Sequence, residues 1–271
     1  MLKQRILTAL VLAPLVIWGI LSLPTLWFGG LVGLFVTVGA WEWARLAGFE
    51  STLARIMFAS LVGVLLVLMG MATALSEWNL LIAGAVIWWG YATWVVFGYD
   101  GAQNPARSIA RLSVGLVLLL PAWLALVKLH GSAQGPMALL FLMVLIWGAD
   151  SGAYFAGRAF GKHKLAPKVS PGKSWEGVAG ALLLTLSVAI GGGVWLWQWQ
   201  GMQVVMFVVL CVVTVALSIV GDLYESMAKR RVGIKDSGNI LPGHGGVLDR
   251  IDSLTSAAPV FVLGYSWMAP L

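Results

Sequence analysis

The sequence contains 271 residues, of which 60% are hydrophobic and only 10% are charged, and its formal net charge is +6. A soluble domain usually carries about 25% charged residues, so this composition excludes a soluble globular protein and indicates that lipid surrounds much of the chain. The single cysteine, Cys211, excludes an internal disulfide framework and a multi-cysteine metal site. The positive charge follows from membrane topology and does not indicate nucleic-acid binding.

The predicted membrane spans begin close to the N-terminus. The first apolar run is longer than the apolar core of a signal peptide, about 7–15 residues, so we predict a retained first span. A membrane helix needs about 20 mostly apolar residues. The chain offers nine such segments: residues 6–23, 26–44, 56–75, 78–98, 109–128, 136–157, 177–198, 202–221 and 254–271. The sequence thus predicts an all-α integral membrane protein, a polytopic bundle of nine transmembrane helices.

The basic residues set the predicted orientation of these spans. With nine spans and a cytoplasmic N-terminus, every Lys and Arg except Lys128 falls on the cytoplasmic side, as the positive-inside rule requires. The C-terminus is then outside, and a compact chain of this kind is typical of the bacterial cytoplasmic (inner) membrane. We divide it into N-terminal membrane helices, 1–135, and a catalytic membrane region, 136–271, with long cytoplasmic loops at 158–176 and 222–253.

The second long loop carries acidic and basic side chains at helical spacing. If the eighth span continues as a helix beyond the membrane, Asp222, Ser226 and Lys229 share one face of it. Asp249 and Asp252 are three residues apart and would share a face in the same way. Three carboxylates then converge at the start of the last span. Oxygen donors without cysteine suit Mg²⁺ better than Zn²⁺.

Polar side chains outside that loop form a second group of candidates. Asp150 lies within the sixth predicted span, where an ionisable side chain costs about 2.5–3.5 kcal/mol and therefore usually has a function or a partner. Ser170 and Lys173 follow in a glycine-containing stretch that suits phosphate contact, although a proline stands where a Walker A loop needs glycine. Glu42 is expected to form an ordinary ion pair with Arg45, three residues on.

Several of these motifs resemble the signature of the phosphatidate cytidylyltransferase family, also called CDP-diacylglycerol synthases. The matching stretches are Ser226-Met227-Ala228-Lys229-Arg230-Arg231, Lys235-Asp236 and Leu241-Pro242-Gly243-His244-Gly245-Gly246-Val247-Leu248-Asp249-Arg250-Ile251-Asp252. Asp150 and the stretch from Ser170 to Gly177 are also similar to that family, whereas the N-terminal half agrees in hydropathy alone.

The resemblance implies a reaction, a cofactor and an assembly. Members of the family convert CTP and phosphatidate (phosphatidic acid) to CDP-diacylglycerol and pyrophosphate with Mg²⁺, and a monovalent cation such as K⁺ can accompany the Mg²⁺. The enzymes are embedded among membrane lipids and form homodimers. The phosphate monoester of the lipid is the nucleophile, so the protein has mainly to hold two polyanions together.

The resemblance also implies roles for individual residues. Catalytic roles fall to Asp222, Lys229, His244, Asp249 and Asp252. Mg²⁺ would be bound by Asp222, Asp249 and Asp150. Substrate contacts would come from Ser170, Lys173, Ser226, Arg230, Lys235, Gly245, Gly246 and Arg250. The sequence leaves open whether Lys173 or Lys229 binds the lipid phosphate.

Two alternative functions remain open from the sequence. The first is a related CTP-dependent lipid or polyprenol phosphotransferase, against which the signature argues. The second belongs to another class, an ion-coupled membrane transporter with Asp150 on the ion path. The polar residues cluster in loops on one side, whereas transporters bind their substrates near the bilayer midplane.

Overall fold

The computed structural model describes residues 2–72, 78–240, 243 and 245–269. Within these residues the chain forms nine α-helices and a single two-stranded antiparallel sheet. The elements are α1 (Leu2–Ser22), α2 (Thr25–Leu46), α3 (Thr52–Met71), α4 (Trp78–Phe97), α5 (Ile109–His130), α6 (Gly135–Phe160), β1 (Lys164–Ala166), β2 (Ser170–Ser174), α7 (Trp175–Gly191), a π-helical turn (Gly192–Leu196), α8 (Met202–Arg231) and α9 (Leu248–Met268).

Seven of these helices, α2 to α8, are long and apolar enough to cross a membrane, with the π-helical turn extending α7. The described side chains of α1 add a shorter apolar run, Ala13–Ser22. The prediction of an all-helical, polytopic membrane protein is therefore confirmed. Large apolar side chains such as Leu80, Trp94 and Trp195 are exposed on the outside of the bundle, as expected where lipid replaces water.

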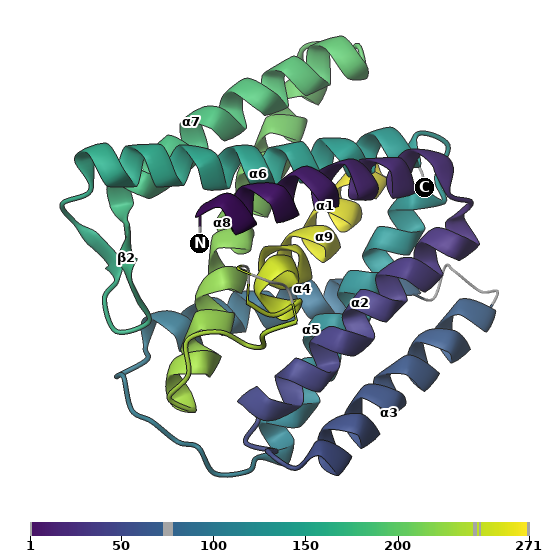
Figure 1. Cartoon of the computed structure of the whole chain (residues 1–271). Helices are drawn as coiled ribbons and strands as arrows, with labels where there is room; N and C mark the ends of the chain where they lie inside the picture. Colours follow the sequence, from purple (N-terminus) through teal and green to yellow (C-terminus); the bar gives the residue numbers. More distant parts are fainter. Residues whose placement is uncertain (1, 73–77, 241–242, 244, 270–271) are drawn as a thin grey trace.

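The ninth helix lies at the centre of the bundle, where it packs against α2, α4, α5, α6 and α8 (Figure 1). Small side chains let the neighbouring helices approach it closely, and Ser256, Ala257 and Ala258 are fully buried. In Figure 1, α1 runs alongside α6, and α7 covers the outer side of α6. The central position of α9 brings it into contact with helices from both halves of the chain.

Helices α6 and α7 approach each other closely at a pair of glycines. A Cβ atom added to Gly152 would lie 2.5 Å from the carbonyl oxygen of Gly180, and one added to Gly180 would lie equally close to the carbonyl oxygen of Gly152. No larger side chain fits at either position without separating the helices. This contact fixes the end of α6 against the start of α7, and so positions the hairpin that connects them.

The Gly180→Ala variant is expected to destabilise the protein by about 1–3 kcal/mol, the usual cost of overpacking a close contact. The matched control is Gly84→Ala in α4, where an added Cβ atom meets nothing within 4 Å. The measurement is the thermal unfolding midpoint of each variant in detergent. Equal midpoints for the two alanine variants would contradict the proposed role of this helix contact.

The two long loops are more regular than the sequence predicts. In the first, 158–176, α6 continues to Phe160 and is followed by the β1–β2 hairpin, in which Lys164 pairs with Ser174 and Ala166 with Ser170. In the second, 222–253, both ends are helical, because α8 continues to Arg231 and α9 already begins at Leu248. The helical continuation that the spacing of the polar residues allowed is therefore present over 222–231 and 248–253, where polar partners such as the Lys229–Asp249 pair stabilise both helices beyond their apolar parts.

Candidate active site

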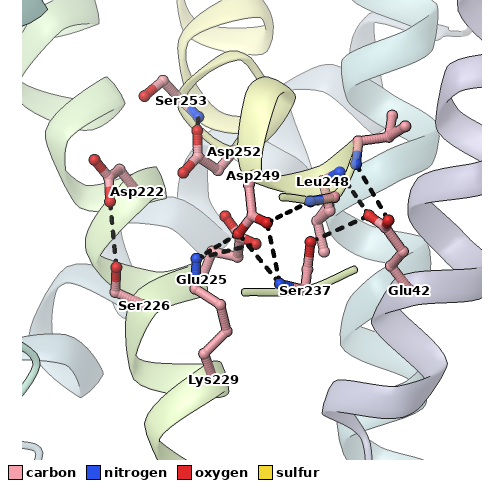
Figure 2. Close-up of polar contacts among 12 residues, drawn as sticks. Glu42, Asp222, Glu225, Ser226, Lys229, Ser237, Leu248, Asp249, Asp252 and Ser253 are labelled. Carbon is pink, nitrogen blue, oxygen red and sulfur yellow. Dashed lines mark hydrogen bonds and ion pairs between the residues drawn. The ribbon is translucent and has the colours of Figure 1, made fainter. Parts of the chain in front are cut away.

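The C-terminal end of α8 presents a row of polar side chains. Asp222, Glu225, Ser226 and Lys229 follow one another at helical spacing, and the hydroxyl of Ser226 donates to Asp222 over 3.3 Å. Because α8 remains helical to Arg231, the prediction that Asp222, Ser226 and Lys229 share a face is confirmed. Figure 2 shows this row facing the first turn of α9.

Lys229 joins α8 to α9. Its ammonium group lies 2.6 Å from a carboxylate oxygen of Asp249 and 3.5 Å from one of Glu225. The other carboxylate oxygen of Asp249 accepts the backbone N–H groups of Ser237 at 3.0 Å and Gly246 at 2.7 Å. Three donors from three segments therefore fix the position of the Asp249 carboxylate.

These contacts set the acidity of the two aspartates at the start of α9, both of which precede the predicted span 254–271. Burial alone would raise the pKa of Asp249, but the hydrogen bonds from Lys229 and Gly246 outweigh it and hold that pKa below its usual value. For Asp252, burial and the neighbouring Asp222 carboxylate raise the pKa to about 7. The Asp249 carboxylate is thus stabilised as the anion, whereas the anion of Asp252 would be stabilised by a positive charge placed beside it.

The hairpin supplies a second lysine to the site. The ammonium group of Lys173, on β2, lies 2.8 Å from a carboxylate oxygen of Asp222 on α8. At the end of the strand, the hydroxyl of Ser174 accepts the N–H of Gly177 and caps α7. The cap and the ion pair hold β2 against α8, so two segments that lie far apart in the sequence meet at Asp222.

A cavity of about 400 Å³ lies among α6, α8 and the first turn of α9. Its lining is Met143, Ile146, Trp147, Asp150, Asp222, Lys229, Asp236, Asp249, Arg250, Asp252, Ser253 and Leu254. Six of the residues predicted for the site therefore line the same cavity. Asp236, from the signature stretch Lys235-Asp236, lines it as well.

A second cavity, of about 300 Å³, adjoins the first and has a more apolar lining. Its walls include Ala153, Val178 and Ala181 from α6 and α7, and its polar end includes Lys173. Asp150 and Asp222 line both cavities. An acidic compartment and an apolar compartment thus share one pair of carboxylates.

The remaining predicted residues lie around this centre. The side chain of Arg230 donates to the carbonyl of Val169 at 3.3 Å, so it ties α8 to the hairpin. Ser170 begins β2, and Lys235 is exposed after α8; neither lines the two cavities. Substrate contact by these three residues stays a prediction.

The glycine-rich stretch before α9 is described in part. Gly245 has a positive φ of 81°, and an added Cβ atom there would lie 2.6 Å from Asp249. The Gly246 N–H, expected to face a substrate, donates to the Asp249 carboxylate. His244, the predicted catalytic histidine, lies outside the described residues.

Two acidic residues of this region were missed from the sequence. Glu42 and Arg45 form no ion pair in the described structure; instead, the buried Glu42 carboxylate accepts hydrogen bonds from Ser237, Val247 and Leu248. The predicted pair with Arg45 is therefore wrong. Glu225 is also buried, and its position four residues before Lys229 on one helix face was the signal that could have identified it.

Comparison with known proteins places the chain among cytidylyltransferases. Residues 3–268 match the model of the cytidylyltransferase family. The phosphatidate cytidylyltransferase of Pseudomonas aeruginosa is 51% identical over 277 residues, with 100% of both chains covered. Those of Haemophilus influenzae and Thermotoga maritima are 40% and 32% identical, covering 98% and 96% of this chain and 99% and 94% of their own. The chain therefore belongs to the cytidylyltransferase family.

Proposed function

We propose that the protein transfers CMP from CTP to phosphatidate, giving CDP-diacylglycerol and pyrophosphate. In this reaction a phosphate oxygen of phosphatidate bonds to the α-phosphorus of CTP. The bond from that phosphorus to the oxygen bridging to the β-phosphorus breaks, and pyrophosphate leaves. Full-length similarity to proteins named for this activity supports the proposal, and so does the geometry of the site.

The observation that carries the proposal is the pair of adjoining cavities. A nucleoside triphosphate needs a polar space with cations and metal-binding oxygens, which the first cavity supplies. A diacyl lipid needs an apolar space that keeps its tails away from water, which the walls from α6 and α7 supply in the second. The shared carboxylates, Asp150 and Asp222, lie where the phosphates of the two substrates would meet.

The donors around the first cavity fit a magnesium ion by their chemistry. Its lining has five aspartates against one lysine and one arginine, so the site has an excess of negative charge: Asp150, Asp222, Asp236, Asp249 and Asp252, with Lys229 and Arg250. The Glu225 carboxylate next to this cavity is also buried, and the Lys229 ammonium group lies 3.5 Å from one of its oxygens. Among the described side chains, no three acidic, histidine or cysteine groups already converge as a ligand set.

We assign Mg²⁺ to Asp222, Asp249 and Asp150, with room for a monovalent cation such as K⁺ among the remaining carboxylates. When bound, Mg²⁺ would neutralise phosphate charge and polarise the α-phosphate. Lys173 and Lys229 would exchange their present carboxylate partners for phosphate oxygens, since an ammonium group can form an ion pair with either anion. These side chains position two polyanions that would otherwise repel each other, and no protein nucleophile is needed.

We also propose the finer topology: nine spans, the N-terminus in the cytoplasm and the C-terminus outside, in the bacterial inner membrane. The distribution of Lys and Arg supports it, and so do two contacts. Lys128, the one basic residue expected outside, contacts Asn79 at the start of α4. At the other end of α4, the N–H of Asn104 donates to the carbonyl of Arg231 beside the site. A homodimer is proposed from the family resemblance alone.

The decisive experiment is transfer of labelled CMP to lipid by detergent-purified protein. Transfer and pyrophosphate release should require CTP, phosphatidate and Mg²⁺ together, and omission of any one should abolish both. Polyprenol and other lipid acceptors test the alternative of a related CTP-dependent phosphotransferase, and nucleotide-independent uptake into liposomes tests the transporter. A folded preparation that transfers no CMP to any lipid phosphate would refute the proposal.

A further inference from the structure

Glu42 lies in the N-terminal half of the chain, yet its side chain reaches the segment that carries Asp249. It belongs to α2 and is fully buried. One carboxylate oxygen accepts the N–H of Leu248 at 2.8 Å and the hydroxyl of Ser237 at 3.1 Å, and the other accepts the N–H of Val247 at 3.2 Å. Figure 2 shows this carboxylate at the first turn of α9.

The three donors include backbone groups that a helix cannot satisfy by itself. The first N–H groups of an α-helix have no partner within the helix, and they carry its partial positive charge. Val247, which precedes α9, makes no side-chain capping hydrogen bond. A carboxylate from α2 therefore takes the place of a local cap and fixes where α9 begins.

The same residues hold Asp249. The N–H of Ser237 donates to Asp249, while the hydroxyl of Ser237 donates to Glu42. The N–H of Gly246 donates to Asp249, and its neighbour Val247 donates to Glu42. Two short segments thus lie between two carboxylates, one at the cavity and one that lies outside both cavities.

Two glycines make this close packing possible. A Cβ atom added to Gly246 would lie 2.5 Å from both carboxylate oxygens of Glu42, and one added to Gly238 would collide with the same carboxylate. These glycines leave room for a side chain from α2. A carboxylate buried at such cost, with its hydrogen bonds all directed to the two segments that hold Asp249, indicates a dedicated role.

We propose that Glu42 is a positioning residue, which fixes Ser237 and the first turn of α9 so that Asp249 is held toward the acidic cavity. This inference rests on the proposed function for its kinetic consequence. Its structural part, the link between Glu42 and the start of α9, can be tested independently of any activity.

The test is the Glu42→Gln variant of the full-length protein, with Glu50→Gln as the control. Glutamine has nearly the same shape, but its NH₂ group would face an N–H or O–H donor, so one of the three contacts is lost. We expect kcat to fall about 10–100-fold, as for partners that orient a metal-binding carboxylate. The KM for phosphatidate should stay at the wild-type value, because Glu42 lies outside both cavities. Glu50 is exposed after α2, and its variant should match the wild type.

A second measurement is amide hydrogen exchange, followed by mass spectrometry on peptides covering residues 246–252. Loss of the Glu42 acceptor should speed exchange there, while α3 and α4 keep their wild-type rates. Wild-type kcat, or a lower kcat with unchanged exchange in this segment, would overturn the inference. If the wild-type protein transfers no CMP, the proposed function fails and the exchange result alone decides the role of Glu42.

The Ser237→Ala variant tests the same link if Glu42→Gln does not fold. It removes one donor to Glu42 and leaves the backbone N–H that binds Asp249. We expect a smaller fall in kcat in the same direction, with faster exchange at the start of α9. Wild-type kcat and exchange in this variant would also overturn the inference.

Discussion

The Asp249→Asn variant should fold and insert normally yet lose at least about 100-fold in turnover, the scale typical of removing one group that stabilises charge in a transition state. Asparagine keeps the shape of the side chain but removes the negative charge that pairs with Lys229 at 2.6 Å. Its NH₂ group would also face the N–H donors of Ser237 and Gly246, which now point at a carboxylate. Both the charge and the geometry of the proposed metal ligand are therefore lost.

The measurement is CMP transfer in membranes, normalised to the amount of inserted protein. Asp100→Asn is the matched control, because the carboxylate of Asp100 caps the N–H of Ala102 in an exposed loop away from the cavity. That control should retain wild-type turnover. Wild-type rates in Asp249→Asn membranes would exclude Asp249 as a metal ligand and as a group that acts in the reaction.

Replacing Lys229 with glutamine should affect both stability and turnover. The Lys229 ammonium group is half-buried between two carboxylates, and removing one partner of a buried ion pair costs about 3–5 kcal/mol because a charge remains without compensation. Turnover should also fall by at least about 100-fold if this ammonium group meets a phosphate in the reaction. The measurements are the thermal midpoint in detergent and the rate of CMP transfer.

A second substitution separates the two effects. Glu225→Gln, added to Lys229→Gln, removes one of the stranded charges and should recover part of the lost stability without restoring turnover. Lys168→Gln, an exposed position in the turn of the hairpin, is the control and should change neither quantity. Recovery of turnover in the double variant would show that Lys229 acts through folding alone.

The fold was largely predictable because hydropathy reports membrane helices directly. The helices of the structure lie close to all nine predicted segments, with α8 longer at its C-terminal end and α9 longer at its N-terminal end. The extensions were less predictable, since they depend on tertiary partners such as the Lys229–Asp249 pair. The β1–β2 hairpin was missed because strands of three and five residues leave too short a pattern to detect.

The site was predictable where one helix carries its residues, and unpredictable where distant segments meet. Helical spacing placed Asp222, Ser226 and Lys229 on one face without knowledge of any other helix. Glu42 lies about two hundred residues from its hydrogen-bond partners in the chain. The sequence alone suggested only Arg45, three residues away, as a partner. Only the packing of α2 against α9 reveals its contacts.

Asp150 and Asp222 line two adjoining cavities whose other walls differ, so under the proposed function we expect the two substrate preferences to depend on different residues. Ala153, Val178 and Ala181 line the apolar cavity alone, whereas Arg250 lines the acidic one alone. If the apolar cavity holds the lipid, as proposed, we expect substitutions in the first group to alter the choice of acyl chains and to leave nucleotide selection unchanged. The walls of the lipid cavity would then be free to vary without any change in the two shared carboxylates.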